Sequence, residues 1–171
     1  MMETEARRAQ IKQLLQSSEQ PLTGTDLAER LGVSRQVIVQ DMAVLRAAGH
    51  EILASPQGYY LPRPLWETHR TVVAVRHTPA QTEDELIALV DVGVEVVDVI
   101  VEHPIYGEQR GMLHIASRED VRRFMDRLSA TGARLLSELT DGLHLHTLAA
   151  RRPEQLRRAR QVLRERGYLV E

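Results

Sequence analysis

The 171-residue sequence has no cysteine, a single lysine (Lys12), one phenylalanine and one tryptophan. Without cysteine the chain forms no disulfide and offers no thiolate nucleophile or Cys-containing zinc finger. Any metal site must therefore use histidine, aspartate or glutamate. The sequence also lacks an apolar run long enough to cross a bilayer, and its first ten residues lack the apolar segment of a signal peptide. We therefore expect a globular cytoplasmic protein.

An excess of positive charge is also missing. The chain has 22 Lys and Arg residues against 24 Asp and Glu, for a formal net charge of −2. Basic and acidic residues are equal in number over residues 1–70. Many nucleic-acid-binding proteins carry a global excess of positive charge. If this chain binds DNA, the contact must come from a local group of side chains.

Residues 1–62 have the pattern of three helices followed by a short hairpin. The first helix ends before Pro21, because the residue preceding a proline avoids helical dihedral angles. A short second helix is predicted with Thr25 as its N-cap and Gly32 as its left-handed C-terminal residue. Ser34 then caps a longer third helix. Two helices joined by a tight glycine turn form a helix-turn-helix.

A strand, a Pro-Gln-Gly turn at 56–58 and a second strand follow the third helix, a pattern that predicts the wing of a winged helix. Two prolines then indicate a linker at 63–70. We therefore predict an N-terminal winged helix-turn-helix domain over residues 1–62 and a second domain over residues 71–171.

The third helix carries the candidate DNA-reading residues, because a recognition helix presents its N-terminal turn to base edges in the major groove. Arg35 can bind a guanine through two nitrogens, and Gln36 can pair with an adenine. Ser34 or Gln40 can hold a phosphate or a base edge. Tyr59 on the wing can touch the DNA backbone. Alternatively, this is a capped, solvated helix start in a domain that binds no DNA; the helix order and the hairpin favour DNA binding.

A resemblance supports the DNA-binding interpretation. The stretch "PLTGTDLAERLGVSRQVIVQDMAVLRAAGHEI", residues 21–52, resembles the DNA-binding end of bacterial regulators of the biotin-repressor and deoxyribose-repressor type. Modules of this kind are attached to many different sensor domains. The resemblance therefore implies DNA binding and leaves the signal open.

From residue 71 on, strand and helix patterns alternate. Gly93 and Gly132 end helices, Thr82 and Ser117 are expected as N-caps, and Pro153 opens the last helix. This alternation predicts a two-layer α+β domain of about 100 residues with helices on one face of a sheet. Strands are expected at 70–77, 94–107, 111–116 and 142–149, and helices at 82–93, 117–132 and 152–167.

Four residues of this domain form a candidate metal site. His144 and His146 lie two apart in an alternating strand, so both side chains point to one face, about 7 Å apart. His77 ends the first strand and Glu85 lies in the first turn of the next helix, so one strand-helix turn can bring both into one cleft. Three imidazoles and a carboxylate suit a divalent ion such as Zn, Ni, Fe or Co. Each part alone also fits a half-polar strand, a strand-end cap or an ordinary helix start.

The combination of motifs is more specific than its parts. The helix-turn-helix and linker, followed by "VVAVRHTPAQTEDELIALVDVG", "VIVEHPIYGE" and "LHLHTL", resemble the three-histidine (3H) domain regulators, the niacin-responsive NiaR-type repressors of bacteria, over essentially the whole chain. The resemblance implies a sensor domain folded like the histidine phosphocarrier protein (HPr-like) and a transition-metal site with Ni, Zn or Fe. It also implies nicotinic acid as corepressor and a homodimeric repressor of niacin-uptake or NAD-synthesis genes on double-stranded operator DNA.

Residue roles follow from the same resemblance. Carried over by motif, the metal ligands are His77, Glu85, His144 and His146. His103 and Tyr106 belong to the central His-Pro-x-Tyr-Gly motif, whose role the pattern does not define. An arginine can take the negative charge of a pyridine carboxylate, and Arg76 and Arg110 are possible partners. We take His103, Tyr106 and Arg76 as the candidate effector contacts.

The residues alone leave three alternatives open. A metal hydrolase would use Glu85 as general base beside a zinc-bound water. A phosphocarrier would carry phosphate on His77. A metal-free sensor would use the histidine pair to line an apolar pocket. The attached DNA-reading domain favours a sensor, and no second catalytic carboxylate or nucleophile stands out, so we expect no enzyme activity.

Overall fold

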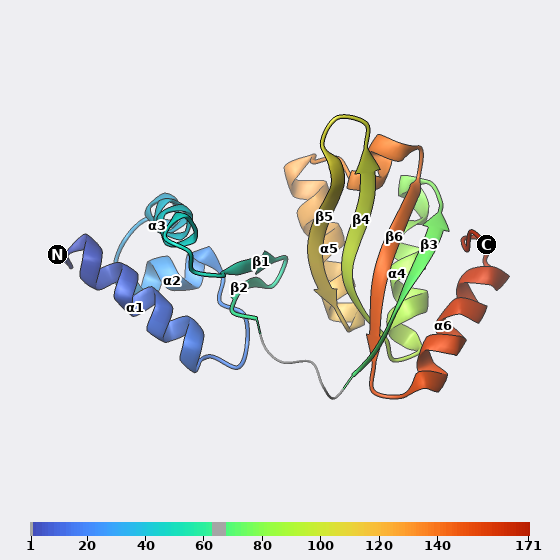
Figure 1. The fold of residues 1–171 in the computed structure, drawn as a ribbon, viewed down its shortest axis with the longest axis horizontal. Helices are drawn as coiled ribbons and strands as arrows, with labels where there is room; N and C mark the ends of the chain where they lie inside the picture. Colours follow the sequence, from blue (N-terminus) through green and yellow to red (C-terminus); the bar gives the residue numbers. More distant parts are fainter. Residues whose placement is uncertain (1, 63–67) are drawn as a thin grey trace. The chain divides into compact units, whose positions relative to one another are not determined.

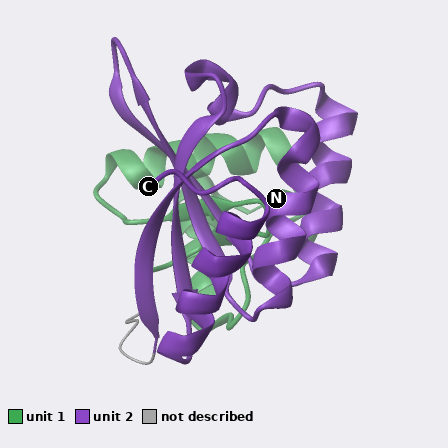
Figure 2. Cartoon of the chain, turned by 90° about the vertical axis from the view of Figure 1, so that its right-hand side faces the viewer, with its two compact units in different colours: residues 1–64 green, residues 65–171 purple. Residues whose placement is uncertain are grey.

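The computed structural model describes residues 2–62 and 68–171. The chain divides into two compact units, Met1–Pro64 and Leu65–Glu171, which Figure 2 shows in two colours. Most of the linker expected at 63–70 lies outside the described residues. Its last two residues, from His69 on, belong to the first strand of unit 2. In the described part of the chain, no helix is long and apolar enough to cross a membrane.

Unit 1 contains the three expected helices, and the helix-turn-helix prediction is confirmed. Gly32 ends the second helix with φ of 66°, in the left-handed region that glycine adopts without steric cost. The hydroxyl of Ser34 accepts a hydrogen bond from the Val37 N–H and caps the third helix. The helices are α1 Thr4–Ser17, α2 Gly24–Leu31 and α3 Arg35–Ala47. Their shared core is formed by Ile11, Leu15, Leu27, Ile38, Met42 and Leu45.

Two expected N-caps are wrong. Thr23, not Thr25, caps α2: its hydroxyl accepts from the Asp26 N–H at 3.0 Å, and the Asp26 carboxylate accepts from the Thr23 N–H at 3.3 Å. In unit 2 a short 3₁₀ turn, η1 Pro79–Gln81, precedes the first helix, so Thr82 is its first residue and not its cap. In both places several polar residues can cap, and the path of the entering backbone decides which one does.

The predicted wing is present and short. Strands β1 Leu53–Ser55 and β2 Gly58–Tyr60 form the hairpin, and Leu22 pairs with Tyr59 across an additional bridge. Gly58, with φ of 125°, lies so close to this bridge that a Cβ would be 2.5 Å from the carbonyl carbon of Leu22. The close contact between the backbones of Gly58 and Leu22 therefore requires glycine at position 58. It attaches the wing to the segment that precedes α2.

Unit 2 follows the order β-α-β-β-α-β-α, with one antiparallel sheet in strand order β3-β6-β4-β5 and helices behind it in Figure 1. The two-layer α+β prediction is confirmed. The expected strand at 111–116 is too short, because β5 continues the hairpin with β4 directly from its turn and begins at Gly107. The strands are β3 His69–Arg76, β4 Glu95–His103, β5 Gly107–Ile115 and β6 Leu143–Ala150. The helices are α4 Thr82–Asp91, α5 Arg118–Thr131 and α6 Pro153–Glu165.

The register of β3 and β6 decides which face the histidine pair occupies. Val73 lies opposite His146 and Val75 opposite His144, and all four side chains are buried. Alternate residues of a strand face the same side of a sheet. The pair therefore continues the buried row of Leu148 toward the helices, and the interpretation as an ordinary half-polar strand is wrong.

A buried ion cluster joins α1 to α3. Asp41 is 1% exposed, and Arg7 donates to its carboxylate through Nε at 2.6 Å and Nη2 at 3.0 Å. Arg8 donates through Nε at 3.0 Å. Burial alone would raise the pKa of Asp41, but the hydrogen bonds and charges of Arg7 and Arg8 outweigh it and lower that pKa. The carboxylate is therefore ionised and holds both arginines of α1 on α3.

We predict that Asp41→Asn lowers the free energy of unfolding of unit 1 by about 3 kcal/mol at neutral pH, because Arg7 loses its buried counter-charge. A carboxyl with a lowered folded pKa stabilises above its unfolded pKa, and loses that contribution as the pH falls through the folded value. The difference from the parent should therefore shrink below about pH 4. Amide hydrogen exchange of α1 and α3 across a denaturant series measures it.

Glu29→Gln, at an exposed position of α2, removes the same charge and serves as the control. A similar loss of stability in both variants, or a difference that does not change with pH, would contradict the role given to Asp41.

Candidate functional site

The expected DNA-reading residues lie on the solvent side of unit 1. Ser34, Arg35, Gln36 and Gln40 are all exposed at the beginning of α3, whose opposite side is buried in the core through Ile38. The hydroxyl of Ser34 is engaged in the helix cap. This exposed N-terminal turn is where a recognition helix meets base edges. Contacts of these residues with bases stay a prediction.

Tyr59 is half-buried and has a structural role. Its backbone exchanges hydrogen bonds with Leu22 at 2.9 and 2.7 Å, and its ring packs on the core of unit 1. The guanidinium of Arg46 lies 5.8 Å from the ring centroid and donates to the carbonyl of Ile52. Tyr59 thus fastens the wing to the helices, and its expected contact with the DNA backbone stays a prediction.

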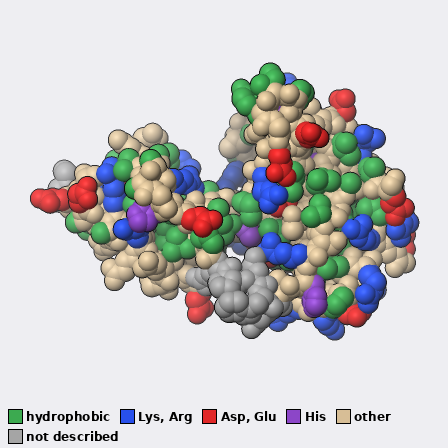
Figure 3. Space-filling view, viewed as in Figure 1, with side chains coloured by type: hydrophobic (Ala, Val, Ile, Leu, Met, Phe, Trp, Pro, Cys, Tyr) green, Lys and Arg blue, Asp and Glu red, His purple; other side chains and the backbone are tan. Residues whose placement is uncertain are grey.

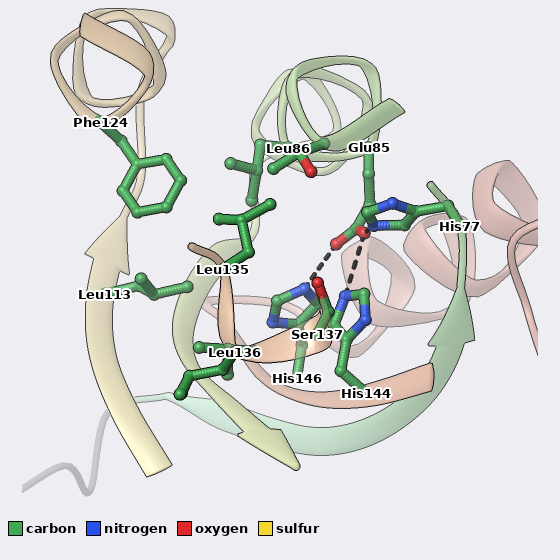
Figure 4. A pocket seen from close by; sticks show the side chains of 12 residues that line it. His77, Glu85, Leu86, Leu113, Phe124, Leu135, Leu136, Ser137, His144 and His146 are labelled. Atoms are coloured by element: carbon green, nitrogen blue, oxygen red, sulfur yellow. Dashed lines mark hydrogen bonds and ion pairs between the residues drawn. The ribbon is translucent and has the colours of Figure 1, made fainter. Parts of the chain in front are cut away.

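In unit 2 the imidazoles of three expected ligands converge on the carboxylate of the fourth, Glu85 (Figure 4). Glu85 Oε2 contacts His77 Nε2 and lies 3.3 Å from His144 Nε2, while Glu85 Oε1 lies 2.5 Å from His146 Nε2. One possible ligand atom from each of His77, Glu85 and His144 falls within 4.8 Å of the others. None of the four residues is more than 7% exposed. The structure therefore brings the strand end, the helix start and the His-x-His strand together, and their role as metal ligands stays a prediction.

Tertiary contacts place each of these side chains. His77 extends the buried row of Val73 and Val75 beyond the end of β3, next to the start of β6. Gly142, with φ of 88°, allows the backbone before β6 to approach the backbone of His77 closely. A Cβ at this position would be 2.3 Å from the carbonyl oxygen of His77. Glu85 reaches the same point from the first turn of α4.

All three imidazoles are oriented by backbone carbonyls. His77 Nδ1 lies 2.8 Å from the carbonyl of Thr78, and His144 Nδ1 lies 2.8 Å from that of Gly142. His146 Nδ1 lies 2.6 Å from a carbonyl of β4. A carbonyl only accepts, so each Nδ1 carries a proton and each Nε2 is directed at Glu85. Metal-binding histidines typically donate their other N–H in this way.

The electrostatics of the cluster require positive charge. Burial alone would raise the pKa of Glu85, but His146 and His144 outweigh it and lower that pKa. Burial alone would lower the pKa of His146, but Glu85 outweighs it and raises that pKa. His77 Nε2 and Glu85 Oε1 are buried and lack a hydrogen bond of regular geometry among the described residues, although His77 Nε2 contacts Glu85 Oε2 and Glu85 Oε1 lies 2.5 Å from His146 Nε2. Positive charge between the four side chains, either protons on the imidazole Nε2 atoms or a metal ion, would offset the repulsion between the buried carboxylate and the nitrogen lone pairs.

Sequence reasoning missed two residues that hold the imidazoles. Asp98 supplies the carbonyl that accepts from His146, and its carboxylate accepts from the N–H and hydroxyl of Thr147 at 2.8 and 2.9 Å. The register of β4 shifts at this point, which turns the Asp98 carbonyl toward the neighbouring imidazole. Tyr168 packs its ring 5.3 Å from that of His77. No local sequence pattern predicts the register shift at Asp98 or the contact between Tyr168 and His77, because both depend on residues far apart in the chain.

The cluster forms one wall of a cavity of about 40 Å³. Room of this size holds a few water-sized groups. The polar wall adds the hydroxyls of Thr82 and Ser137 to the four candidate ligands. The rest of the lining is apolar, and Figure 4 shows Leu113 and Phe124 across from the histidines. The apolar lining residues are Leu86, Val99, Leu113, Phe124, Leu135 and Leu136.

The three candidate effector contacts do not line this cavity. Arg76 is exposed at the end of β3. His103 and Tyr106 lie at the β4–β5 turn, where His103 Nδ1 accepts from the N–H of Ile105 at 3.1 Å and of Tyr106 at 3.3 Å. His103 therefore stabilises a turn whose tip is exposed and apolar, with Ile105 80% and Tyr106 73% exposed. An effector contact by these residues stays a prediction.

A helix-turn-helix joined to a separate domain with a buried polar cluster defines the class: a DNA-binding regulator with a second domain of its own. The 3H domain family matches residues 70–171, and an HTH domain family matches residues 7–60. The chain belongs to the 3H-domain family of NiaR/NadR transcription repressors. Its relatives are repressors, so the protein is a regulator and not an enzyme, and the hydrolase and phosphocarrier alternatives are set aside.

Two relatives carry this assignment over nearly the full length. The probable transcription repressor NiaR of Thermotoga maritima is 42% identical over 165 residues, which cover 96% of this chain and 94% of the relative. The transcription repressor NadR of Bacillus subtilis is 42% identical over 167 residues, which cover 96% of this chain and 93% of the relative.

We predict that Arg35→Ala loses operator affinity while it keeps weak binding to random DNA. A two-bond contact from arginine to guanine contributes about 1–3 kcal/mol of discrimination. The measurement is the ratio of the two dissociation constants at one fixed salt concentration, with an operator selected from random duplexes. Arg30→Ala, at an exposed position of α2, removes the same charge and should leave this ratio unchanged. If Arg35→Ala keeps the parent's ratio, Arg35 does not read bases.

Proposed function

We propose that this chain represses genes for niacin uptake or NAD synthesis, with nicotinic acid as corepressor. In this proposal a divalent transition metal, one of Ni, Zn or Fe, is held by His77, Glu85, His144 and His146. The observation that carries it is the buried set of three Nε2 atoms directed at one carboxylate. Family membership supports repression, and the resemblance to niacin-responsive regulators supports the effector.

The residues fit a metal ion by three criteria. Three nitrogens and one oxygen form a donor set for a borderline divalent ion and leave coordination positions for a small ligand. The second nitrogen of each imidazole already donates to a carbonyl. Two of the donor atoms, His77 Nε2 and Glu85 Oε1, are buried without a hydrogen bond of regular geometry among the described residues, and each lies against another donor atom of the same set. A bound ion would supply the Lewis acid that those atoms lack.

Coupling between effector and DNA follows from linkage. A small molecule changes DNA affinity only by binding better to the state whose recognition helices match the groove, and DNA must favour the effector by the same factor. The apolar core of unit 2 is formed without the four ligands, from residues such as Val73, Leu89 and Leu163. We therefore expect the metal to be required for the effector response and not for folding.

We predict a homodimer that binds an inverted repeat. One recognition helix makes too few base contacts for specificity in a genome, and two-fold symmetry with half-sites one or more helical turns apart doubles them. Light scattering of the free protein and of its complexes with a full site and a half-site measures the stoichiometry. Only monomer at micromolar concentration, with no change on DNA, would contradict the prediction.

We predict that His146→Ala weakens metal binding by more than about 100-fold. Removing a residue that only hydrogen-bonds to a metal ligand typically costs about 10- to 100-fold in metal affinity, and removing a ligand itself should cost more. Nicotinate-dependent repression should disappear, while circular dichroism and effector-free DNA affinity stay near the parent's. Titration with Ni²⁺, followed by operator binding with and without nicotinate, measures both. His50→Ala, at an exposed position of unit 1, is the control and should behave as the parent.

Two results would contradict the proposed function. One is a normal nicotinate response of His146→Ala. The other is unchanged nicotinate affinity after the metal is removed by a chelator. Either result would favour the metal-free sensor, with the histidines as lining of the pocket.

A further inference from the structure

Arginines of unit 2 gather at the end of the sheet where β3 begins and β6 ends (Figure 1). Arg70, near the beginning of β3, pairs with Ala149 near the end of β6. Arg151 and Arg152 follow β6 directly and lead into α6. Neighbouring strands lie about 5 Å apart. Arg70 therefore lies beside the segment of backbone that carries the other two arginines.

The positive charge at this end has no carboxylate partner in the described part of the chain. Arg70, Arg151 and Arg152 are exposed, and their guanidinium groups form no ion pair with a described residue. Arg160 of α6 donates to the hydroxyl of Thr71 at 3.1 Å and to the carbonyl of β3 residue 72 at 2.9 Å. Both of these acceptors are neutral. We call Arg70, Arg151, Arg152 and Arg160 the basic end.

Two carboxylates that border the basic end are engaged with other side chains. Glu95 begins β4 and pairs with Ala149, and its carboxylate lies 2.7 Å from His114 Nδ1. Glu154, in the first turn of α6, accepts from Arg157 at 3.0 Å. Positive charges placed together without counter-charges repel one another, and a bound anion offsets that repulsion. The basic end therefore has the charge of a surface that binds anions.

Duplex DNA is a polyanion, and the helix-turn-helix of the same chain binds it. His69, the first residue of β3, follows Tyr60, the last residue of the wing, by nine positions. Nine residues span at most about 30 Å when fully extended. One helical turn of DNA is about 34 Å long. DNA that extends beyond the site bound by unit 1 is therefore within reach of the beginning of β3.

We propose that the basic end is a second DNA contact, which binds backbone phosphates that flank the site read by α3. Arg70 and Arg151 each bind a phosphate, and Arg152 and Arg160 add positive potential beside them. A guanidinium suits this role because it donates two parallel N–H bonds to phosphate oxygens. Such a contact positions the protein and carries no sequence information. It depends on DNA binding by unit 1 and on neither the metal nor the effector.

The first experiment measures the affinity of the full chain for a long duplex at several salt concentrations. The logarithm of the binding constant falls with the logarithm of the salt concentration by about 0.9 for each phosphate that is neutralised. Arg70→Ala and Arg151→Ala should each reduce this slope by about one and weaken binding by about five- to tenfold at 0.1 M salt. A selected operator and a random duplex should be weakened by the same factor.

Two further variants serve as controls. Arg127→Ala removes the same charge at an exposed position of α5 that also forms no ion pair with a described residue, and should leave the slope unchanged. Arg151→Lys keeps the charge and should keep most of the slope. An unchanged slope in both Arg70→Ala and Arg151→Ala, or an equal decrease in Arg127→Ala, overturns the proposal.

The second experiment changes the length of the DNA. One duplex ends at the selected operator, and the other extends one helical turn beyond it on each side. The parent should bind the longer duplex at least about tenfold more tightly, and the double variant Arg70→Ala/Arg151→Ala should bind both lengths about equally. Equal affinity of the parent for the two lengths overturns the proposal.

The remaining outcomes separate this contact from its alternatives. Circular dichroism and light scattering of the double variant should match the parent, because both side chains are exposed. A loss of the parent's oligomeric state would assign the basic end to an interface between copies of this chain and overturn the DNA contact. A parent that binds no duplex overturns DNA binding by unit 1 and this contact together. A parent that binds DNA, beside a double variant with the same affinity and slope, overturns this contact alone.

Discussion

The convergence of three imidazole nitrogens on one buried carboxylate is the constraint around which unit 2 is arranged. Each Nδ1 is held by a carbonyl, so each Nε2 is directed inward at Glu85. Lone pairs and a carboxylate in a low-dielectric interior repel one another unless a cation lies between them. The strand register, the first turn of α4 and the close backbone approach at Gly142 bring these side chains together.

The same strands that hold the cluster also build the core. Along the helix-facing side of β6, the residues change from Ala150 and Leu148 to His146 and His144, so one face turns from apolar to polar within a few residues. The apolar end packs against α4 and α6 and supports the domain. The polar end opens on the cavity, where α5 and the 3₁₀ turn η2 Leu136–Thr140 supply an apolar wall. The apolar core and the buried polar cluster thus occupy opposite ends of one sheet.

The helix-turn-helix and the histidine cluster belong to units with separate cores. In unit 1 the buried Asp41 holds α1 on α3, and the exposed beginning of α3 carries Arg35 and Gln36. On the face shown in Figure 3, basic and acidic side chains are interspersed over unit 2. With a net charge of −2, the chain has no overall excess of positive charge to attract DNA.

The sequence by itself determined the local features: the helix-turn-helix with its cap at Ser34 and turn at Gly32, the alternation of strands and helices, and a shared face for the His-x-His pair. These follow from dihedral preferences and periodicity, which act over a few residues. Only the tertiary structure decided that this face is buried, that Thr23 and not Thr25 caps α2, and that residues 135–137 close the cavity. Glu85 and His144 are 59 positions apart in the chain, and strand order and register, not local preference, bring such residues into contact.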